Sequence, residues 1–301
     1  MPPTSRPVAA VLLSGALLCA SLGAGAADPD GAPARSAART DAPSRALIEE
    51  LTLATRQDRQ FDEIARSVAD GLVQGVETAE GPVAEGTLDA VRTAAAAAFS
   101  PERIEGAVGS RLSASLSEDD VRHIVGRART PLWRRALDAE ASHDLEEDPA
   151  AFAAFAMGLG GDDDDAERLE AAGALLDALG GAEAFAALVI DTQVAMIGGA
   201  AMADPYSHPD EVGAALAAIE GERAAITAQM DELMPLVFAW TYEDLSTKEL
   251  HAIVADARSP AWRRFNAATL EGLRDAMVGG SVEFTDRIAR AGRALERTSR
   301  I

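Results

Sequence analysis

The chain has 301 residues and a formal net charge of −22, with 27 Lys and Arg against 49 Asp and Glu. Such an acidic surface disfavours nucleic acid and anionic lipid as partners, because both are bound through positive charge. Alanine is abundant and aromatic residues make up only 4% of the chain, a usage that favours helix over sheet. We therefore expect an all-α protein without a sheet.

The N-terminus has the pattern of a secretory signal peptide. Arg6 is the only charge before Asp28, an apolar run covers residues 8–22, and small residues follow it. This order predicts a leader over residues 1–27, cleaved near Ala26-Ala27. The alternative is a membrane anchor, but the run is shorter than the roughly 20 residues of a typical span.

The only cysteine, Cys19, lies inside this leader. A lipoprotein is disfavoured, because Leu18 precedes Cys19 where a small residue is expected. The mature chain would therefore have no disulfide and depend on its core for stability. No later stretch looks long and apolar enough to span a bilayer, so we expect a soluble periplasmic or secreted protein without stable membrane insertion after leader cleavage.

Residues 28–45 lack an apolar period and are expected to form a disordered linker. Helical patterns begin at Ala46. One stripe consists of Phe61, Ile64, Val68 and Leu72, and a helix is expected over residues 88–99. Ser100-Pro101 then predicts a new helix, with Ser as N-cap and Pro at the first position. The apolar face of that helix is Ile104, Val108 and Leu112.

A 24-residue segment occurs twice, as Leu116–Ala139 and Leu245–Ala268, at a constant offset of 129 with eleven identities. Each copy predicts a capped helix, a sharp corner at Thr-Pro or Ser-Pro, and a second helix that begins Pro-x-Trp-Arg-Arg. The motif residues are Ser117, Asp120, Pro131, Trp133, Ser246, Glu249, Pro260 and Trp262. The repeat predicts two related antiparallel helical units of helix–corner–helix type.

The boundary between the units is expected at Gly160-Gly161, which gives a first unit over residues 46–160 and a second over residues 161–301. In the second unit, helices are expected over about 166–179, 185–196, 210–219 and 222–240. A last helix is expected from Ser281, because Gly279-Gly280 resembles a helix stop.

This order of elements resembles an uncharacterised family of bacterial periplasmic helical proteins, the domain of unknown function twenty fifty-nine, present here as two diverged copies. In that family an aromatic pair precedes Ser-Pro and a Gly lies two residues after the Pro. Here Arg127-Ala128 and Asp256-Ala257 replace the pair, and Trp133 and Trp262 occupy the Gly position. The resemblance implies a periplasmic helical fold and no established activity.

Residues for catalysis or metal binding do not form a recognisable pattern. His123 and His251 lie in the two copies at non-equivalent positions, and His143 and His208 lack a ligand spacing. The run Asp162–Asp165 lacks the spacing of a calcium loop and is interpreted as a solvated helix start. We expect no metal, no cofactor and no enzymatic activity.

Three arginine pairs are identical in both copies: Arg129/Arg258, Arg134/Arg263 and Arg135/Arg264. The last two pairs lie near helix beginnings, where the helix dipole disfavours cations. Local ion pairs could compensate, for example with Asp138. Alternatively, the arginines and the helix N–H groups could form an anion site.

The leading interpretation is a non-catalytic, soluble periplasmic helical module that binds a protein or a cell-envelope component. A small-ligand or anion-binding protein that uses the arginine corners is the alternative, and an enzyme of unknown class comes third. The sequence does not indicate an oligomeric state.

Overall fold

The computed structural model describes residues 42–77, 86–142, 149–159, 163–203 and 208–298. In these ranges the chain forms helices and no strand, which confirms the expected all-α fold. The helices are α2 (Arg45–Ala54), α3 (Gln57–Glu77), α4 (Thr87–Ala98), α5 (Pro101–Ser115), α6 (Glu118–Ala128), α7 (Pro131–Glu140), α8 (Pro149–Gly158), α9 (Asp163–Ala178), α10 (Gly181–Ala203), α11 (Pro209–Thr241), α12 (Thr247–Ala257) and α13 (Pro260–Thr298). The predicted leader, most of the predicted linker, His143 and the predicted unit boundary at Gly160-Gly161 lie outside the described residues.

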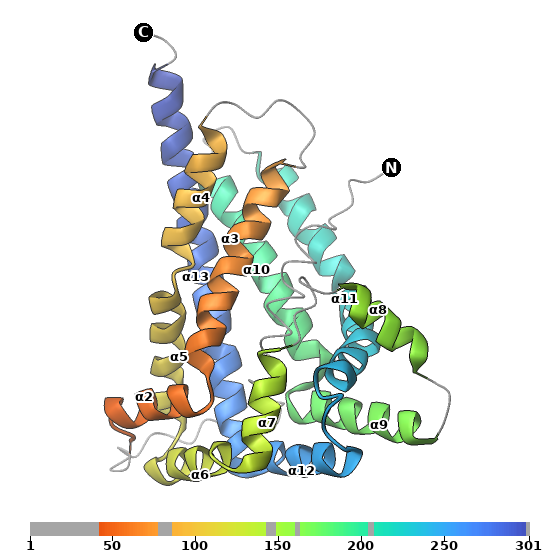
Figure 1. Cartoon of the computed structure of the whole chain (residues 1–301). Helices are drawn as coiled ribbons and strands as arrows, with labels where there is room; N and C mark the ends of the chain where they lie inside the picture. Colours follow the sequence, from red (N-terminus) through yellow and green to blue (C-terminus); the bar gives the residue numbers. More distant parts are fainter. Residues whose placement is uncertain (1–41, 78–85, 143–148, 160–162, 204–207, 299–301) are drawn as a thin grey trace.

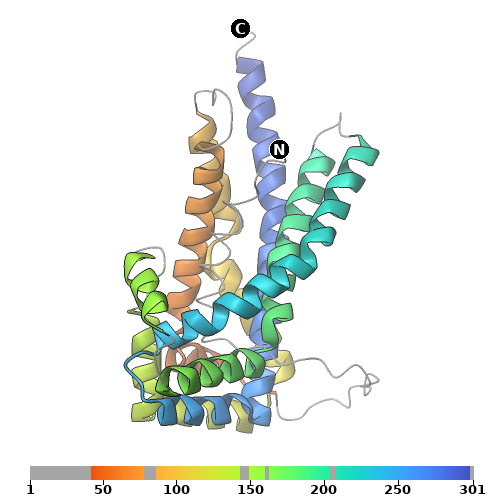
Figure 2. The ribbon, with the colours of Figure 1, turned by 90° about the vertical axis from the view of Figure 1, so that its right-hand side faces the viewer.

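The long helix α13 runs from the lower end of the molecule to its upper end (Figure 1). It packs against α4 and α5 on one side and against α10 on another. The short helices α6 and α12 lie across the lower end of the molecule in Figure 1, where α9 also lies. Helices α10 and α11 pack as a pair and lean away from α3 and α4 (Figure 2).

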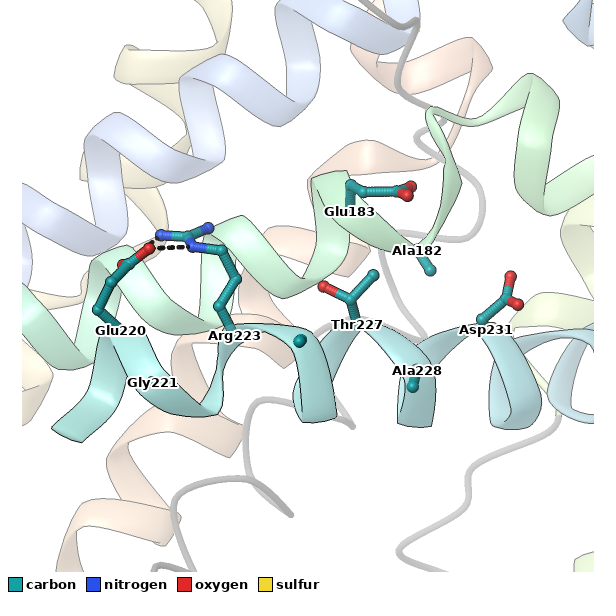
Figure 3. A pocket seen from close by; sticks show the side chains of 9 residues that line it. Ala182, Glu183, Glu220, Gly221, Arg223, Thr227, Ala228 and Asp231 are labelled. Atoms are coloured by element: carbon teal, nitrogen blue, oxygen red, sulfur yellow. Dashed lines mark hydrogen bonds and ion pairs between the residues drawn. The ribbon is translucent and has the colours of Figure 1, made fainter. Parts of the chain in front are cut away.

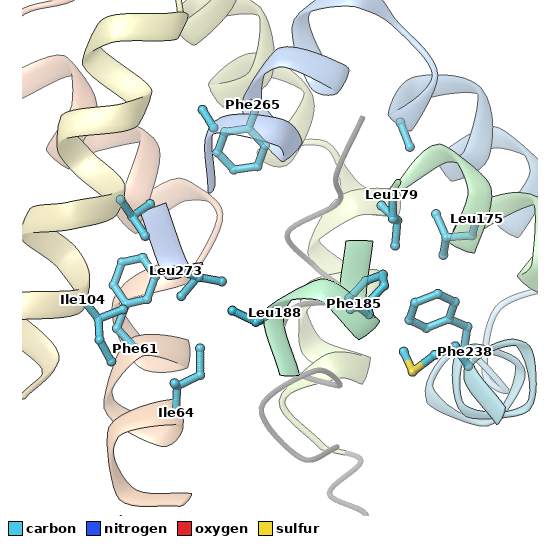
Figure 4. Packing of buried hydrophobic residues seen from close by; sticks show 14 of the residues in the cluster. Phe61, Ile64, Ile104, Leu175, Leu179, Phe185, Leu188, Phe238, Phe265 and Leu273 are labelled. Carbon is cyan, nitrogen blue, oxygen red and sulfur yellow. The ribbon is translucent and has the colours of Figure 1, made fainter. Parts of the chain in front are cut away.

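One cluster of buried side chains connects the whole molecule. It includes Phe61 and Ile104 from the first expected unit and Phe185, Phe238 and Phe265 from the second (Figure 4). The two expected units therefore share one core.

A buried polar contact also joins the two expected units. Gln57 Nε2 of α3 donates to Thr269 Oγ1 of α13 at 3.2 Å, and both side chains are fully buried. A hydrogen bond in this position compensates part of the cost of burying the two polar groups.

The apolar faces predicted from the sequence lie in this core. Ile104, Val108 and Leu112 are fully buried along α5. At the start of that helix, Ser100 Oγ accepts a hydrogen bond from the Arg103 N–H, and Pro101 takes the first position as predicted.

The prediction of a helix stop at Gly279-Gly280 is wrong, because α13 continues from Pro260 to Thr298. A β-carbon at position 280 would lie 2.6 Å from the Phe99 ring, and one at Gly272 would lie 2.5 Å from Val108 Cα. Glycine at these two positions lets neighbouring helices approach α13 closely. That close packing outweighs the weak helix propensity of glycine, which costs about 1 kcal/mol relative to Ala.

Two other helix boundaries differ from the expectation. Residues 210–219 and 222–240 belong to one continuous helix, α11, which passes through Gly221 because its neighbours are strong helix formers. Helix α10 begins at Gly181, four residues earlier than expected. The turn before it needs glycine, since Gly180 and Gly181 have φ values of 112° and 74°.

Among the described helices, the Gly181–Gly199 part of α10 is long and apolar enough to cross a membrane, judged by length and composition alone. This corrects the expectation that no segment after the leader reaches that length. About 39% of the segment is buried inside the protein. It packs there against α11 and α13, as a core helix of similar composition would.

Candidate functional site

The two copies of the repeated segment meet at the lower end of the molecule. Trp133 of α7 and Trp262 of α13, which are equivalent at the offset of 129, stack with ring centroids 4.3 Å apart and planes inclined by 10°. Both rings are buried. We call the two helix corners around this stacked pair the tryptophan junction.

Each copy positions its tryptophan through a capped helix and a proline corner. In α6, Ser117 N–H donates to Asp120 Oδ2 at 3.0 Å, and Asp120 N–H donates to Ser117 Oγ at 3.2 Å. In α12, Ser246 and Glu249 form the same capping box. These reciprocal bonds fix where each helix begins.

The carboxylate of each capping box also binds an arginine of the other copy. Arg135 of α7 pairs with Glu249, and Arg264 of α13 pairs with Asp120, with an Nη2–Oδ1 distance of 2.5 Å. The two ion pairs are equivalent at the offset of 129. This reciprocity is the pattern of a self-complementary interface, in which the same surface is used on both sides.

These contacts change the acidity of both carboxyl groups. The Ser246 backbone N–H, and then Arg135, lower the pKa of Glu249 from 4.5 to about 2. Burial raises the pKa of Asp120, but hydrogen bonds from Arg264 and Ser117 outweigh burial and lower it overall. Both groups are therefore ionised partners of arginine at neutral pH.

One pair of equivalent positions has become complementary in charge. Arg127 of α6 forms an ion pair with Asp256 of α12, the residue at its own aligned position. Asp256 Oδ2 also accepts a hydrogen bond from Trp133 Nε1 at 2.7 Å. The carboxylate thus satisfies a buried indole and an arginine at once.

The remaining predicted arginines fall into two groups. Arg129 pairs with Glu50 of α2 at 2.6 Å, and Arg258 Nη2 lies 3.5 Å from the Ala174 carbonyl oxygen. Arg134 and Arg263 are exposed, and neither forms an ion pair with the described residues. Asp138, the expected local partner, pairs instead with Arg56.

The histidines lie apart from the junction's polar core. His123 and His251 are exposed on α6 and α12, and His208 is the exposed residue before α11. His251 Nε2 lies 3.6 Å from Glu167 Oε1, with both side chains about half exposed. In the described part of the chain, no group of three or more His, Cys, Asp or Glu side chains could hold a metal ion.

Sequence reasoning missed the buried polar group beside the tryptophans. Tyr242 OH donates to Glu140 Oε1 at 2.6 Å, and burial raises the pKa of Tyr242 well above 10. Asn266 is buried next to them, where the first copy has Leu137. The aligned positions 127 and 256 carry opposite charges, Arg and Asp, and this difference was a signal in the sequence that the two copies contact each other there.

A second hollow lies between α10 and α11, away from the junction (Figure 3). It is an open groove of about 650 Å³. Arg223 crosses one end and forms a two-point contact with Glu220, at 2.7 and 2.8 Å. The groove is also lined by Ala224, Ala228, Glu183 and Asp231.

No family model matches this chain, and neither a curated protein nor a solved structure is similar to it. The resemblance to the periplasmic domain family therefore rests on the sequence pattern alone.

Proposed function

We propose that this protein is a non-catalytic helical module of the periplasm or the cell exterior that binds another protein or an envelope component. Its compartment follows from the predicted leader, and the tryptophan junction serves as its structural centre. The contacts at the junction support a structural role, because four of the six repeated arginines bind carboxylates or carbonyl groups of the protein itself.

The observation that carries the proposal is the exposed apolar face of α8. Ala150, Ala153, Ala154 and Met157 follow each other at helical spacing on its solvent side, and Met157 is 81% exposed. None of the ten residues of α8 is buried. Exposed apolar stripes of this kind mark binding surfaces, because covering them removes apolar area from water.

The inner side of α8 holds the helix on the protein. Phe152 packs edge-on against Trp240 of α11, with centroids 5.5 Å apart, and Phe155 is partly buried against the core. The stripe is thus presented on an ordered support. A helix with this arrangement suits insertion into an apolar groove of a partner.

Photo-crosslinking in the native bacterium tests this proposal. A photoreactive residue at position 157 should capture a discrete partner, whereas one at position 53 should not. Leu53 is the matched control, since it is also a large exposed apolar side chain, 64% exposed, on the distant helix α2. With the photoreactive residue placed instead at position 153 of the same stripe, Met157→Lys should abolish the capture, and Leu53→Lys should leave it unchanged. Failure of position 157 to give an adduct would overturn the proposal.

Anion binding is the second candidate, favoured by Arg134 and Arg263. Both are exposed at helix beginnings, with no ion pair among the described residues. If they bind anions, phosphate or citrate should raise the melting temperature, and Arg134→Ala or Arg263→Ala should remove that effect. Arg66→Ala, at an exposed arginine of α3, is the control that should retain it. An equal response of all three variants would exclude this role.

A further inference from the structure

A small cavity lies on one side of the tryptophan junction. Leu175, Leu179 and Ile253 form its apolar wall, and Trp262, Asn266 and Glu140 contribute polar groups. The free space inside is about 10 Å³. This is close to the smallest space that holds one water molecule.

Trp262 and Asn266, which line this cavity, carry buried polar atoms that have no hydrogen-bond partner among the described residues. These are the indole Nε1 of Trp262 and both amide atoms of Asn266. Trp262 is 2% exposed and Asn266 is 1% exposed, so bulk water does not reach them. Buried donors and acceptors are nearly always satisfied, because leaving them unpaired destabilises the fold.

Comparison with the first copy explains why the indole N–H of Trp262, and not that of Trp133, lacks an acceptor. Trp133 Nε1 donates to Asp256, but the residue that corresponds to Asp256 in the first copy is Arg127. An arginine has no acceptor, so it cannot satisfy the indole of Trp262. The second departure is Asn266, which replaces the apolar Leu137. Asn266 lines the cavity together with Trp262, the indole that the first departure leaves without an acceptor.

We propose that this cavity binds a single water molecule that accepts a hydrogen bond from Trp262 Nε1 and donates one to Asn266 Oδ1. The bound molecule must both accept and donate. Ammonium has the right size but no lone pair for the indole N–H. A small anion could accept but not donate to the amide oxygen. Water fits a space of this size, and it has both a lone pair for the indole N–H and protons for the amide oxygen.

A high-resolution crystal structure of the full chain tests the assignment directly. We expect one spherical peak within about 2.7–3.2 Å of both Trp262 Nε1 and an Asn266 amide atom. Asn266→Leu, which restores the side chain of the first copy, should abolish the peak. An empty cavity, or elongated density that belongs to a larger ligand, would overturn the proposal.

Thermal unfolding of the variants provides an independent test. Asn266→Leu should lower the melting temperature by several °C, because it leaves the indole N–H without the bridging water. In the double variant Trp262→Phe/Asn266→Leu, the decrease in melting temperature should be smaller than the sum of the decreases in the two single variants. The double variant removes both polar groups together and leaves neither of them unpaired. Additive losses would contradict a water that links the two residues.

Discussion

At the scale of single residues, two of the arginines near the helix beginnings, Arg135 and Arg264, pair with carboxylates of the other copy. The helix dipole disfavours Arg135 and Arg264 where they stand. Each reaches the carboxylate that caps the equivalent helix of the other copy. One carboxylate therefore stabilises a helix beginning and an arginine together, and the unfavourable placement is compensated.

The acidity of Glu249 gives a prediction about pH. Its pKa in the folded protein, about 2, lies below its ordinary value of 4.5. Its contribution to stability is thus fully present above pH 4.5 and is lost as the pH falls toward 2. We expect Glu249→Gln to melt at a lower temperature at pH 7 and to show a smaller further decrease on acidification.

Melting curves followed by circular dichroism between pH 7 and pH 2.5 measure this difference. Glu222→Gln, at an exposed glutamate of α11, is the matched control and should follow the parent at every pH. Parallel acid dependence of the parent and Glu249→Gln would show that the capping carboxylate does not act in this way.

At the scale of elements, α13 depends on glycine for contact with its neighbours. Gly272 lies against the backbone of Val108 in α5, and Gly280 lies against Phe99 at the end of α4. A side chain at either position would push two helices apart. Glycine also destabilises the helix that contains it. Its net effect on the stability of the protein therefore depends on whether a neighbouring helix packs closely against that position.

Two Gly→Ala changes should therefore have opposite effects. Gly272→Ala should destabilise the protein by about 1–3 kcal/mol, because the new methyl group overlaps backbone that cannot easily move. Gly213→Ala, on an exposed part of α11 with no atom within 4 Å of the new group, should stabilise it by up to about 1 kcal/mol. Urea unfolding at 25 °C measures both. Equal effects of the two changes would contradict the close packing of α5 on α13.

At the scale of the whole molecule, the two expected units are not independent. Helix α13 packs against α4 and α5 of the first unit and against α10 of the second, and the buried cluster is shared. The tryptophan stack and three ion pairs also join the copies. Each unit therefore contributes side chains to the core that the other buries.

We therefore expect one cooperative unfolding transition for the whole chain. Tryptophan fluorescence reports on α11 and the junction, while far-ultraviolet circular dichroism reports on all helices. The two signals should change at the same urea concentration. Two separate transitions would show that the units fold independently in spite of their shared core.

Features that depend on neighbouring residues in the sequence were predictable. The cap at Ser100, the capping boxes at Ser117 and Ser246, and the apolar stripe of α5 all follow from local hydrogen bonding and helical spacing. The all-α class follows from the same local preferences. Nothing beyond a few turns of chain is needed to specify them.

Other features depend on which helices meet, and only the tertiary structure decided them. Gly280 looks like a helix stop until Phe99 is placed against it. Likewise, Asp256 and Asn266 are ordinary polar residues in the sequence. Folding puts Asp256 against Trp133 and Arg127, and it buries Asn266 beside Trp262. The sequence by itself determined where most helices begin and which faces they bury, because those effects are local. Tertiary packing decided which charges pair and which polar groups remain inside, because those contacts join residues far apart in the sequence, such as Asp256 with Arg127 and Trp133.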